Sequence, residues 1–205
     1  MMFSIFLMFF SAVASAQTPS VDDFWEALQE NDLQTVKSLL ASGVSPDTEF
    51  KTDTALTYSI KHDSLDMTRL LLEHHANPDL VQPISQFTPL IVAAKYNQAD
   101  ALSLLLDYHA NVNFTGVFGR GPLHVAALHH SLDAARVLLQ KTDIDVNARG
   151  SLCPLAVASR QGHLDFVQLL IQESKKAFSK KCIDSSKSMA DYNHHSEVLK
   201  LLETI

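Results

Sequence analysis

The sequence predicts an all-α repeat solenoid of about five helix–turn–helix repeats with a degenerate C-terminal cap, and two observations predict it. The first is a seven-residue block at 88–94 (TPLIVAA) that recurs at 121–127 (GPLHVAA), at 153–159 (CPLAVAS) and, more weakly, at 54–60 (TALTYSI). The second is a series of aliphatic clusters centred on Leu39, Leu71, Leu105, Leu138 and Leu170. The steps between these centres are 32, 34, 33 and 32 residues. A regular step of this size is the signature of stacked structural repeats.

Each block has the chemistry of a helix start. Thr88 can cap a helix whose first position is Pro89, where a missing N–H is harmless, and Cys153 can take the same place before Pro154. The alanine pair that follows is small enough to let neighbouring first helices approach closely. The downstream cluster has the apolar spacing of a second helix. Between the two helices the sequence places residue types that tolerate positive φ, namely Asn31, Asp63, Asn97, His130 and Gly162.

A period near 33 residues that holds two short helices and a turn resembles the ankyrin repeat. The loops that follow the second helices, at 43–47, 75–79, 109–113 and 143–147, agree with this resemblance. It covers nearly all of an expected ankyrin-repeat domain at 21–205. The expected repeats are 21–50, 51–84, 85–117, 118–149 and 150–180, and 181–205 would cap the fifth repeat.

The N-terminal residues have the pattern of a secretory signal. Residues 1–13 are almost wholly apolar and uncharged, and the small residues Ala14, Ser15 and Ala16 follow. We expect a signal peptide at 1–16 with cleavage after Ala16 and a short linker at 17–20. No Lys or Arg precedes the apolar run, so a membrane anchor is the main alternative, although the run is shorter than the ~18–20 residues a spanning helix needs. The sequence therefore predicts an exported protein, periplasmic or secreted, that resembles exported bacterial ankyrin-repeat proteins.

The charge balance bears on the partner. The chain has 16 basic and 23 acidic residues and a net charge of −7. This balance argues against a nucleic-acid-binding module, because such modules use Lys and Arg to neutralise phosphates. The run at 113–115 (NFT) is a glycosylation sequon, which has meaning only in a eukaryotic secretory route.

The two cysteines, Cys153 and Cys182, are 29 residues apart, three short of one repeat step. Equivalent positions in adjacent repeats are ~8–10 Å apart. That distance exceeds the ~7 Å Cα–Cα limit for a disulfide, so a bridge requires the three-residue offset to close the gap. The alternative is a buried Cys153 and an exposed Cys182.

The ankyrin resemblance implies protein–protein recognition without catalysis, through a concave surface formed by first-helix residues and hairpin tips. The first-helix residues expected there are Gln29/Glu30, Lys61/His62, Lys95/Tyr96, Leu128/His129 and Arg160/Gln161. The tips are unusually apolar, with Phe50, Leu80, Val81, Ile84, Phe87, Phe114, Val117 and Phe118. Either these side chains bind a partner or they pack between repeats. The residues expected to bind the partner are Phe87, Tyr96, Val117, Phe118, Arg120, Leu128 and His129.

Catalytic and metal-binding alternatives find little support. The histidine pairs at 74–75, 129–130 and 194–195 are adjacent in sequence, and adjacent helical side chains point about 100° apart. No phosphate loop, zinc-protease motif or nucleophile elbow is present. We expect no enzymatic activity, no cofactor and no metal.

Three functions remain open within the binding class. The first is an exported adaptor or regulator of a protein in the same cell, and the second is a secreted effector that engages a host protein. The third is a purely structural spacer. In each case we expect a monomer that binds no nucleic acid and does not insert stably into a membrane once the signal is removed.

Overall fold

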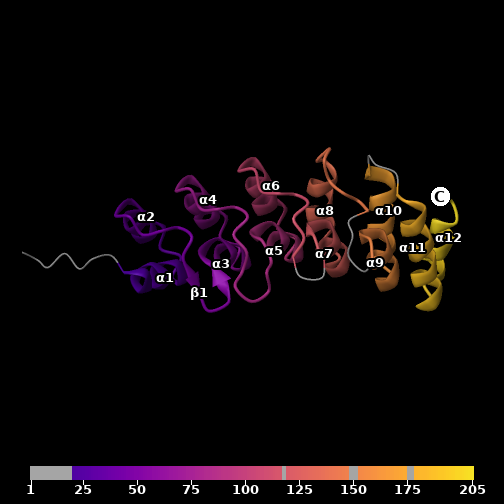
Figure 1. Ribbon diagram of the computed structural model, residues 1–205, viewed down its shortest axis with the longest axis horizontal. Coiled ribbons are helices and arrows are strands. Elements are labelled where there is room, and N and C mark those ends of the chain that lie inside the picture. The colour runs from indigo at the N-terminus through magenta and orange to yellow at the C-terminus, as the bar shows by residue number, and fades with distance from the viewer. Residues whose placement is uncertain (1–19, 117–118, 148–151, 175–177) are drawn as a thin grey trace, which may run out of the picture. The chain divides into compact units, whose positions relative to one another are not determined.

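The computed structural model describes residues 20–116, 119–147, 152–174 and 178–205 (Figure 1). The predicted signal peptide at 1–16 and the linker residues 17–19 lie outside the described residues. The described chain forms two compact units, 20–44 and 45–205. Both units consist of pairs of short helices joined by tight turns. The predicted all-α repeat fold is confirmed.

The first unit is one helix pair, α1 (Val21–Gln29) and α2 (Leu33–Ala41). Ser20 and Asp23 form a capping box at the start of α1, in which each side chain accepts a hydrogen bond from the other residue's N–H. Asp32 caps α2. The hydroxyl and N–H of Thr35 donate to its carboxylate and hold the pKa of Asp32 below its ordinary value. Sequence-local hydrogen bonds therefore fix both helix starts of this unit.

The described residues of the second unit form a small hairpin and five helix pairs. The hairpin strands β1 (Glu49–Phe50) and β2 (Asp53–Thr54) are antiparallel, with Glu49 opposite Thr54 and Phe50 opposite Asp53. The first helices of the pairs are α3 (Ala55–Lys61), α5 (Pro89–Lys95), α7 (Pro122–His129), α9 (Pro154–Gln161) and α11 (Lys180–Tyr192). The second helices are α4 (Leu65–Glu73), α6 (Ala99–Asp107), α8 (Leu132–Leu139), α10 (Leu164–Glu173) and α12 (Ser196–Leu202). In the described part of the chain, β1 and β2 are the only strands.

The five pairs stack in two layers. Each first helix contacts the next first helix, from α3 to α11, and each second helix contacts the next second helix, from α4 to α12. The alanine pair Ala93 and Ala94 in α5 is fully buried, as is the pair Ala126 and Ala127 in α7. Small side chains at these positions let the first helices lie close together, and the leucines of the second helices fill the core between the layers.

The turn between the helices of each pair is left-handed at one residue. Positive φ occurs at Asn31, Asp63, Asn97, His130 and Gly162, as the sequence predicts, and also at His194 between α11 and α12. The degenerate cap is therefore a complete helix–turn–helix pair. The turn side chains also bond to the next repeat. Asn97 accepts from the Ala134 N–H, and the His130 ring bonds to Asp165.

The first helices start at the predicted residues. The hydroxyl of Thr54 accepts a hydrogen bond from the Thr57 N–H, and that of Thr88 accepts from the Ile91 N–H. Cys153 takes the predicted N-cap position before Pro154, but its side chain makes no hydrogen bond to the start of α9. The Cys153 sulfur is bonded elsewhere.

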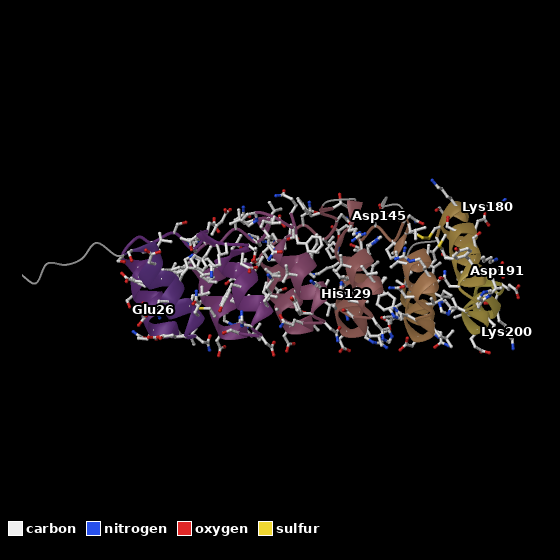
Figure 2. All side chains as sticks on the ribbon, turned by 90° about the horizontal axis from the view of Figure 1, so that it is seen from below. Glu26, His129, Asp145, Lys180, Asp191 and Lys200 are labelled. Atoms are coloured by element: carbon white, nitrogen blue, oxygen red, sulfur yellow. A yellow bond between two sulfur atoms is a disulfide. The ribbon has the colours of Figure 1, made fainter. Side chains whose placement is uncertain are left out.

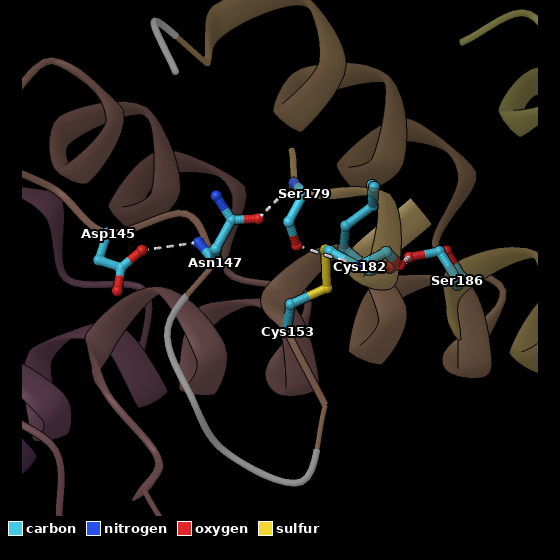
Figure 3. Close-up of a disulfide and its surroundings, with 8 residues drawn as sticks. Asp145, Asn147, Cys153, Ser179, Cys182 and Ser186 are labelled. Carbon is cyan, nitrogen blue, oxygen red and sulfur yellow. Dashed lines mark hydrogen bonds between the residues drawn. A yellow bond between two sulfur atoms is a disulfide. The ribbon is translucent and has the colours of Figure 1, made fainter. Parts of the chain in front are cut away.

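Cys153 and Cys182 form a disulfide with a Cα–Cα distance of 5.9 Å (Figure 3). The alternative of an exposed Cys182 is wrong, because this residue is 4% exposed. The three-residue offset closes the gap in a simple way. Ser179 caps α11, so Cys182 lies three residues inside the helix, whereas Cys153 is the residue just before α9. The bridge joins the fifth predicted repeat to the C-terminal helix pair.

The loops after the second helices are tied by a ladder of hydrogen bonds. A side-chain oxygen of one loop accepts from a backbone N–H of the next loop about one repeat later. The acceptor and donor pairs are Asp47 and Asn77, Asp79 and Asn111, Asn113 and Asp145, and Asn147 and Ser179. Asn113 belongs to the sequon, and its amide nitrogen also donates to the Asp143 carbonyl. The side chain of Asn113 thus has a structural role at both of its polar atoms.

Within the described ranges, none of the helices combines the length and apolar character that crossing a membrane requires.

Candidate protein-binding surface

The last residues of the first helices and their caps form a row of accessible side chains in the second unit. The two residues immediately before each left-handed turn residue have exposed or half-buried side chains. We call this set the helix-end row, and it consists of Lys61, His62, Lys95, Tyr96, Leu128, His129, Arg160, Gln161, Tyr192 and Asn193. Figure 2 shows His129 on the helical layer, away from the edge at which Asp145 and Lys180 lie. Consecutive helices thus present consecutive members of the row at regular intervals.

Several predicted binding residues lie in this row. Tyr96 is 45% exposed, His129 is exposed and Leu128 is half-buried. Tyr192, at 80% exposure, belongs to the same row but was not predicted, because the cap sequence lacks the block that marks the register. Its position two residues before the turn residue His194 identifies it. Gln29 and Glu30 end α1, which belongs to the first unit.

Positive charge gathers around the middle of the row. Burial lowers the pKa of His129, and the nearby ammonium of Lys95 lowers it further. The Lys95 ammonium also lies 5.4 Å from the centre of the Tyr96 ring. Burial and the nearby guanidinium of Arg120 lower the pKa of His124, and Arg160 adds a smaller effect of the same sign. Three cations, Lys95, Arg120 and Arg160, therefore lie close to these histidines and disfavour their protonation.

The depressed pKa of His124 predicts a pH-dependent stability. The unfolded chain takes up a proton at this histidine near pH 6.5, whereas the folded chain does so only at lower pH. The free energy of unfolding therefore falls as pH drops below about 6.5 and levels off once the folded form is also protonated. We expect His124→Gln to reduce the slope of stability between pH 7 and pH 5, measured by urea unfolding. The exposed-site variant His62→Gln is the control, and an unchanged slope in His124→Gln would contradict the prediction.

The hairpin tips present separate apolar groups. Phe50 is 36% exposed, with the Lys51 ammonium 4.8 Å from its ring centre. Ile84 is 72% exposed, whereas Phe87 is half-buried. A methyl group placed on Gly116 would lie 3.3 Å from the Phe87 ring, so this ring packs against the next loop. Arg120 is exposed. Val117 and Phe118 lie outside the described residues.

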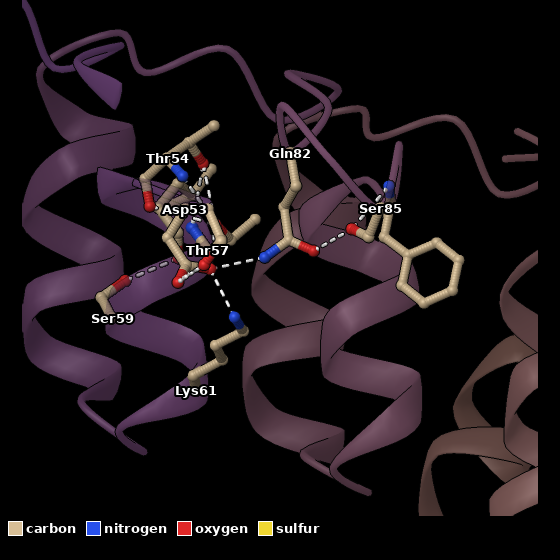
Figure 4. Close-up of polar contacts among 10 residues, drawn as sticks. Asp53, Thr54, Thr57, Ser59, Lys61, Gln82 and Ser85 are labelled. Atoms are coloured by element: carbon tan, nitrogen blue, oxygen red, sulfur yellow. Dashed lines mark hydrogen bonds and ion pairs between the residues drawn. The ribbon is translucent and has the colours of Figure 1, made fainter. Parts of the chain in front are cut away.

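A buried polar cluster holds the tip that carries Ile84 (Figure 4). The Gln82 side chain is 3% exposed. It donates to the Asp53 carboxylate and accepts from the Ser85 hydroxyl. Asp53 also pairs with Lys61, at 2.6 Å between Nζ and Oδ1. The loop at 80–88 is thereby fixed to the preceding repeat. The sequence analysis did not identify Gln82. Its place as a single polar residue in the apolar run at 80–84 could have indicated a buried hydrogen-bonding role.

We expect Gln82→Ala to lower the free energy of unfolding by about 1–2 kcal/mol, because it removes buried hydrogen bonds and leaves a cavity. The matched control is Gln168→Ala, which truncates an exposed glutamine on α10 and should change stability by less than about 0.5 kcal/mol. Urea unfolding measures both variants. Equal effects would show that Gln82 does not anchor the tip.

Two histidines from neighbouring turns contact each other. The rings of His130 and His163 stack at 4.4 Å, and the His163 ring bonds to the Ala127 carbonyl. Among the residues that the structure places, no three or more His, Cys, Asp and Glu side chains are arranged to hold a metal ion. His130 and His163 link neighbouring repeats.

Comparison with known proteins agrees with this architecture. A family model described as ankyrin repeats (3 copies) matches residues 24–116 and 110–184. Alpha-latrotoxin-Lh1a of Latrodectus hasselti is 39% identical over 56 residues, which are 27% of this chain and 4% of the toxin. The chain therefore spans only a small part of that relative's length.

Proposed function

We propose that this chain, which belongs to the ankyrin-repeat family and is thus a protein–protein interaction module, serves as an exported, non-catalytic adaptor or regulator. The helix-end row carries the proposal. It places accessible side chains of five successive repeats on rigid helix ends, where binding orders few additional groups. Ankyrin repeats are typically binding scaffolds rather than enzymes.

We assign partner contacts first to Tyr96, Leu128 and His129, which lie in the row, and to the exposed Arg120. Tyrosine and arginine are enriched among the residues that dominate binding energy at interfaces. Phe87 contributes in this proposal through the exposed part of its ring. Val117 and Phe118 complete the proposed contact set from their place in the sequence.

Export is part of the proposal, with a periplasmic or secreted location. It rests on the apolar segment at 1–13 and the small residues at 14–16. The buried disulfide supports it, because disulfides form and persist in oxidising compartments and are rare in the cytosol. Fractionation of cells, periplasm and medium, with immediate thiol alkylation, tests it. A reduced, full-length chain in the cytosol would contradict export, and accumulation in a host cell would favour an effector role.

Site-specific photocrosslinking tests the binding surface. The phenylalanine analogue p-benzoylphenylalanine replaces Tyr96 in one full-length variant and Tyr108 in the other. Both tyrosines are exposed C-caps of neighbouring helices, but Tyr96 follows α5 and Tyr108 follows the second-layer helix α6. We expect a crosslinked partner from position 96 and none from position 108. Equal crosslinking from both positions, or crosslinking from 108 alone, would contradict the assigned surface.

A further inference from the structure

We infer that the helix-end row binds an acidic polypeptide segment of its partner. This inference rests on the proposed function and adds the chemistry of the partner. The ten positions of the row include Lys61, Lys95, Arg160 and two histidines but no carboxylate, in a chain whose net charge is −7. The row therefore has cationic side chains and no acidic ones, whereas acidic residues outnumber basic ones in the chain as a whole.

The carboxylates of the second unit gather on different elements. Each second helix has one in its first turn, next to the backbone N–H groups that favour negative charge, namely Asp66, Asp100, Asp133, Asp165 and Glu197. The members of the row lie instead at the ends of the first helices. These five carboxylates are not members of the row, although Asp133 accepts a hydrogen bond from the Asn97 amide and Asp165 bonds to the His130 ring, next to Tyr96 and His129.

Carboxylates border the row at both of its ends. Asp53 pairs with Lys61, Asp63 follows His62, and Asp191 precedes Tyr192. Among the described residues, no carboxylate forms an ion pair with Lys95 or Arg160. Between α5 and α9, Lys95 and Arg160 are accordingly the row's cations without a carboxylate partner among the described residues, and we call this segment the cationic centre.

The fixed cations of this centre lie close to two histidines. Lys95 lies close enough to His129, and Arg120 and Arg160 close enough to His124, to disfavour protonation of each histidine. A partner of opposite charge to Lys95 and Arg160 associates faster, and the same charges exclude partners of the wrong sign. Tyr96 and Tyr192 add exposed aromatic area to the charges. Such a surface suits acidic side chains interspersed with apolar ones.

A nucleic acid is the other polyanion to consider. Its phosphates recur without interruption, so a bound strand would extend from the cationic centre over Asp63 or Asp191. The net charge of −7 also repels it at long range. A short acidic peptide segment can place its carboxylates at Lys95 and Arg160 alone. The observations therefore favour the peptide.

Peptide display on the full-length, disulfide-intact chain tests the inference. Random 16-residue peptides are selected at 50 mM salt, and the enriched peptides are synthesised and titrated by fluorescence anisotropy. We expect enriched peptides with a clear net negative charge. Lys95→Glu combined with Arg160→Glu should weaken their binding at least tenfold. Lys180→Glu combined with Lys181→Glu, the same charge change at exposed residues that start α11, should change it less than twofold.

The alternative outcomes separate this inference from the proposed function. If the enriched peptides are neutral or basic and Tyr96→Ala abolishes their binding, the inference of an acidic partner is wrong. The proposed binding surface would still stand. Enriched peptides insensitive to both Tyr96→Ala and the Lys95/Arg160 reversal would overturn the surface itself. If the two charge reversals weaken peptide binding equally, the net charge of the chain explains the effect and the inference is wrong. Displacement of the acidic peptides by a 16-nucleotide single strand at equal concentration would overturn it as well.

Discussion

Replacing both cysteines, Cys153→Ser with Cys182→Ser, is expected to lower the free energy of unfolding of the second unit by about 3–4 kcal/mol at 25 °C. The disulfide spans 29 residues of sequence, and a crosslink over a loop of this length removes that much chain entropy from the unfolded state. Both cysteines are buried, so the serine hydroxyls add a polar penalty of the same sign. Denaturant unfolding of the oxidised chain and the variant gives the difference.

The loss of stability should be largest in the helices next to the disulfide. The bridge joins the start of α9 to the first turn of α11, and in a repeat array each helix pair is held by its neighbours alone. Amide hydrogen exchange should therefore rise most in α11 and α12 and least in α3 and α4. The unmutated chain measured with reductant is the control and should lose the crosslink contribution without the serine penalty, whereas the variant itself should not respond to reductant. Equal denaturation midpoints for the oxidised chain and the variant would contradict the prediction.

The turn geometry of this fold was predictable from residue types because it is a local property. A left-handed residue must follow each first helix, and Asn, Asp, His and Gly tolerate that conformation better than other residues. The resemblance to ankyrin repeats, which usually have a left-handed Gly at this place, identified Asn31, Asp63, Asn97, His130 and Gly162. It could also have located His194, but the cap lacks the Pro-Leu block that sets the register.

Prediction of the disulfide required the start of α11, which could not be located from the sequence. Repeat spacing alone left the two cysteines beyond bonding distance. The start of α11 at Ser179 moves Cys182 one turn into the helix, and the Cα–Cα distance becomes 5.9 Å. Ser179 also donates its N–H to Asn147, so the loop ladder sets where α11 begins.

The tips were the least predictable part of the candidate surface. Composition showed that the tips were apolar but could not distinguish exposure from packing. The structure exposes Ile84 and half-buries Phe87 because Gln82 reaches back 29 residues to Asp53. Such a long-range contact has no local sequence signal. The helix-end row, by contrast, follows directly from the helical period and the turn positions.

Deleting residues 181–205 in the Cys153→Ser background is expected to unfold the outer repeats in order. The C-terminal helices cover α9 and α10, where Val167 and Leu170 are fully buried and Ile171 half-buried. Removing their cover exposes this apolar face to water, which the repeat cannot offset without a neighbour. Hydrogen exchange in α9 and α10 should accelerate about a hundredfold or more, which corresponds to about 2.7 kcal/mol of local stability.

The matched control removes only the exposed residues 203–205, which leaves α12 complete and should leave exchange in α9 and α10 unchanged. The helices α3 to α6 are several repeats away, so their protection should fall far less than that of α9 and α10. This gradient is the measurable consequence of nearest-neighbour stabilisation. A uniform loss of protection from α3 to α10 would mean that the second unit folds as one cooperative block. Retained protection in α9 and α10 would mean that the C-terminal helix pair is not a stabilising cap.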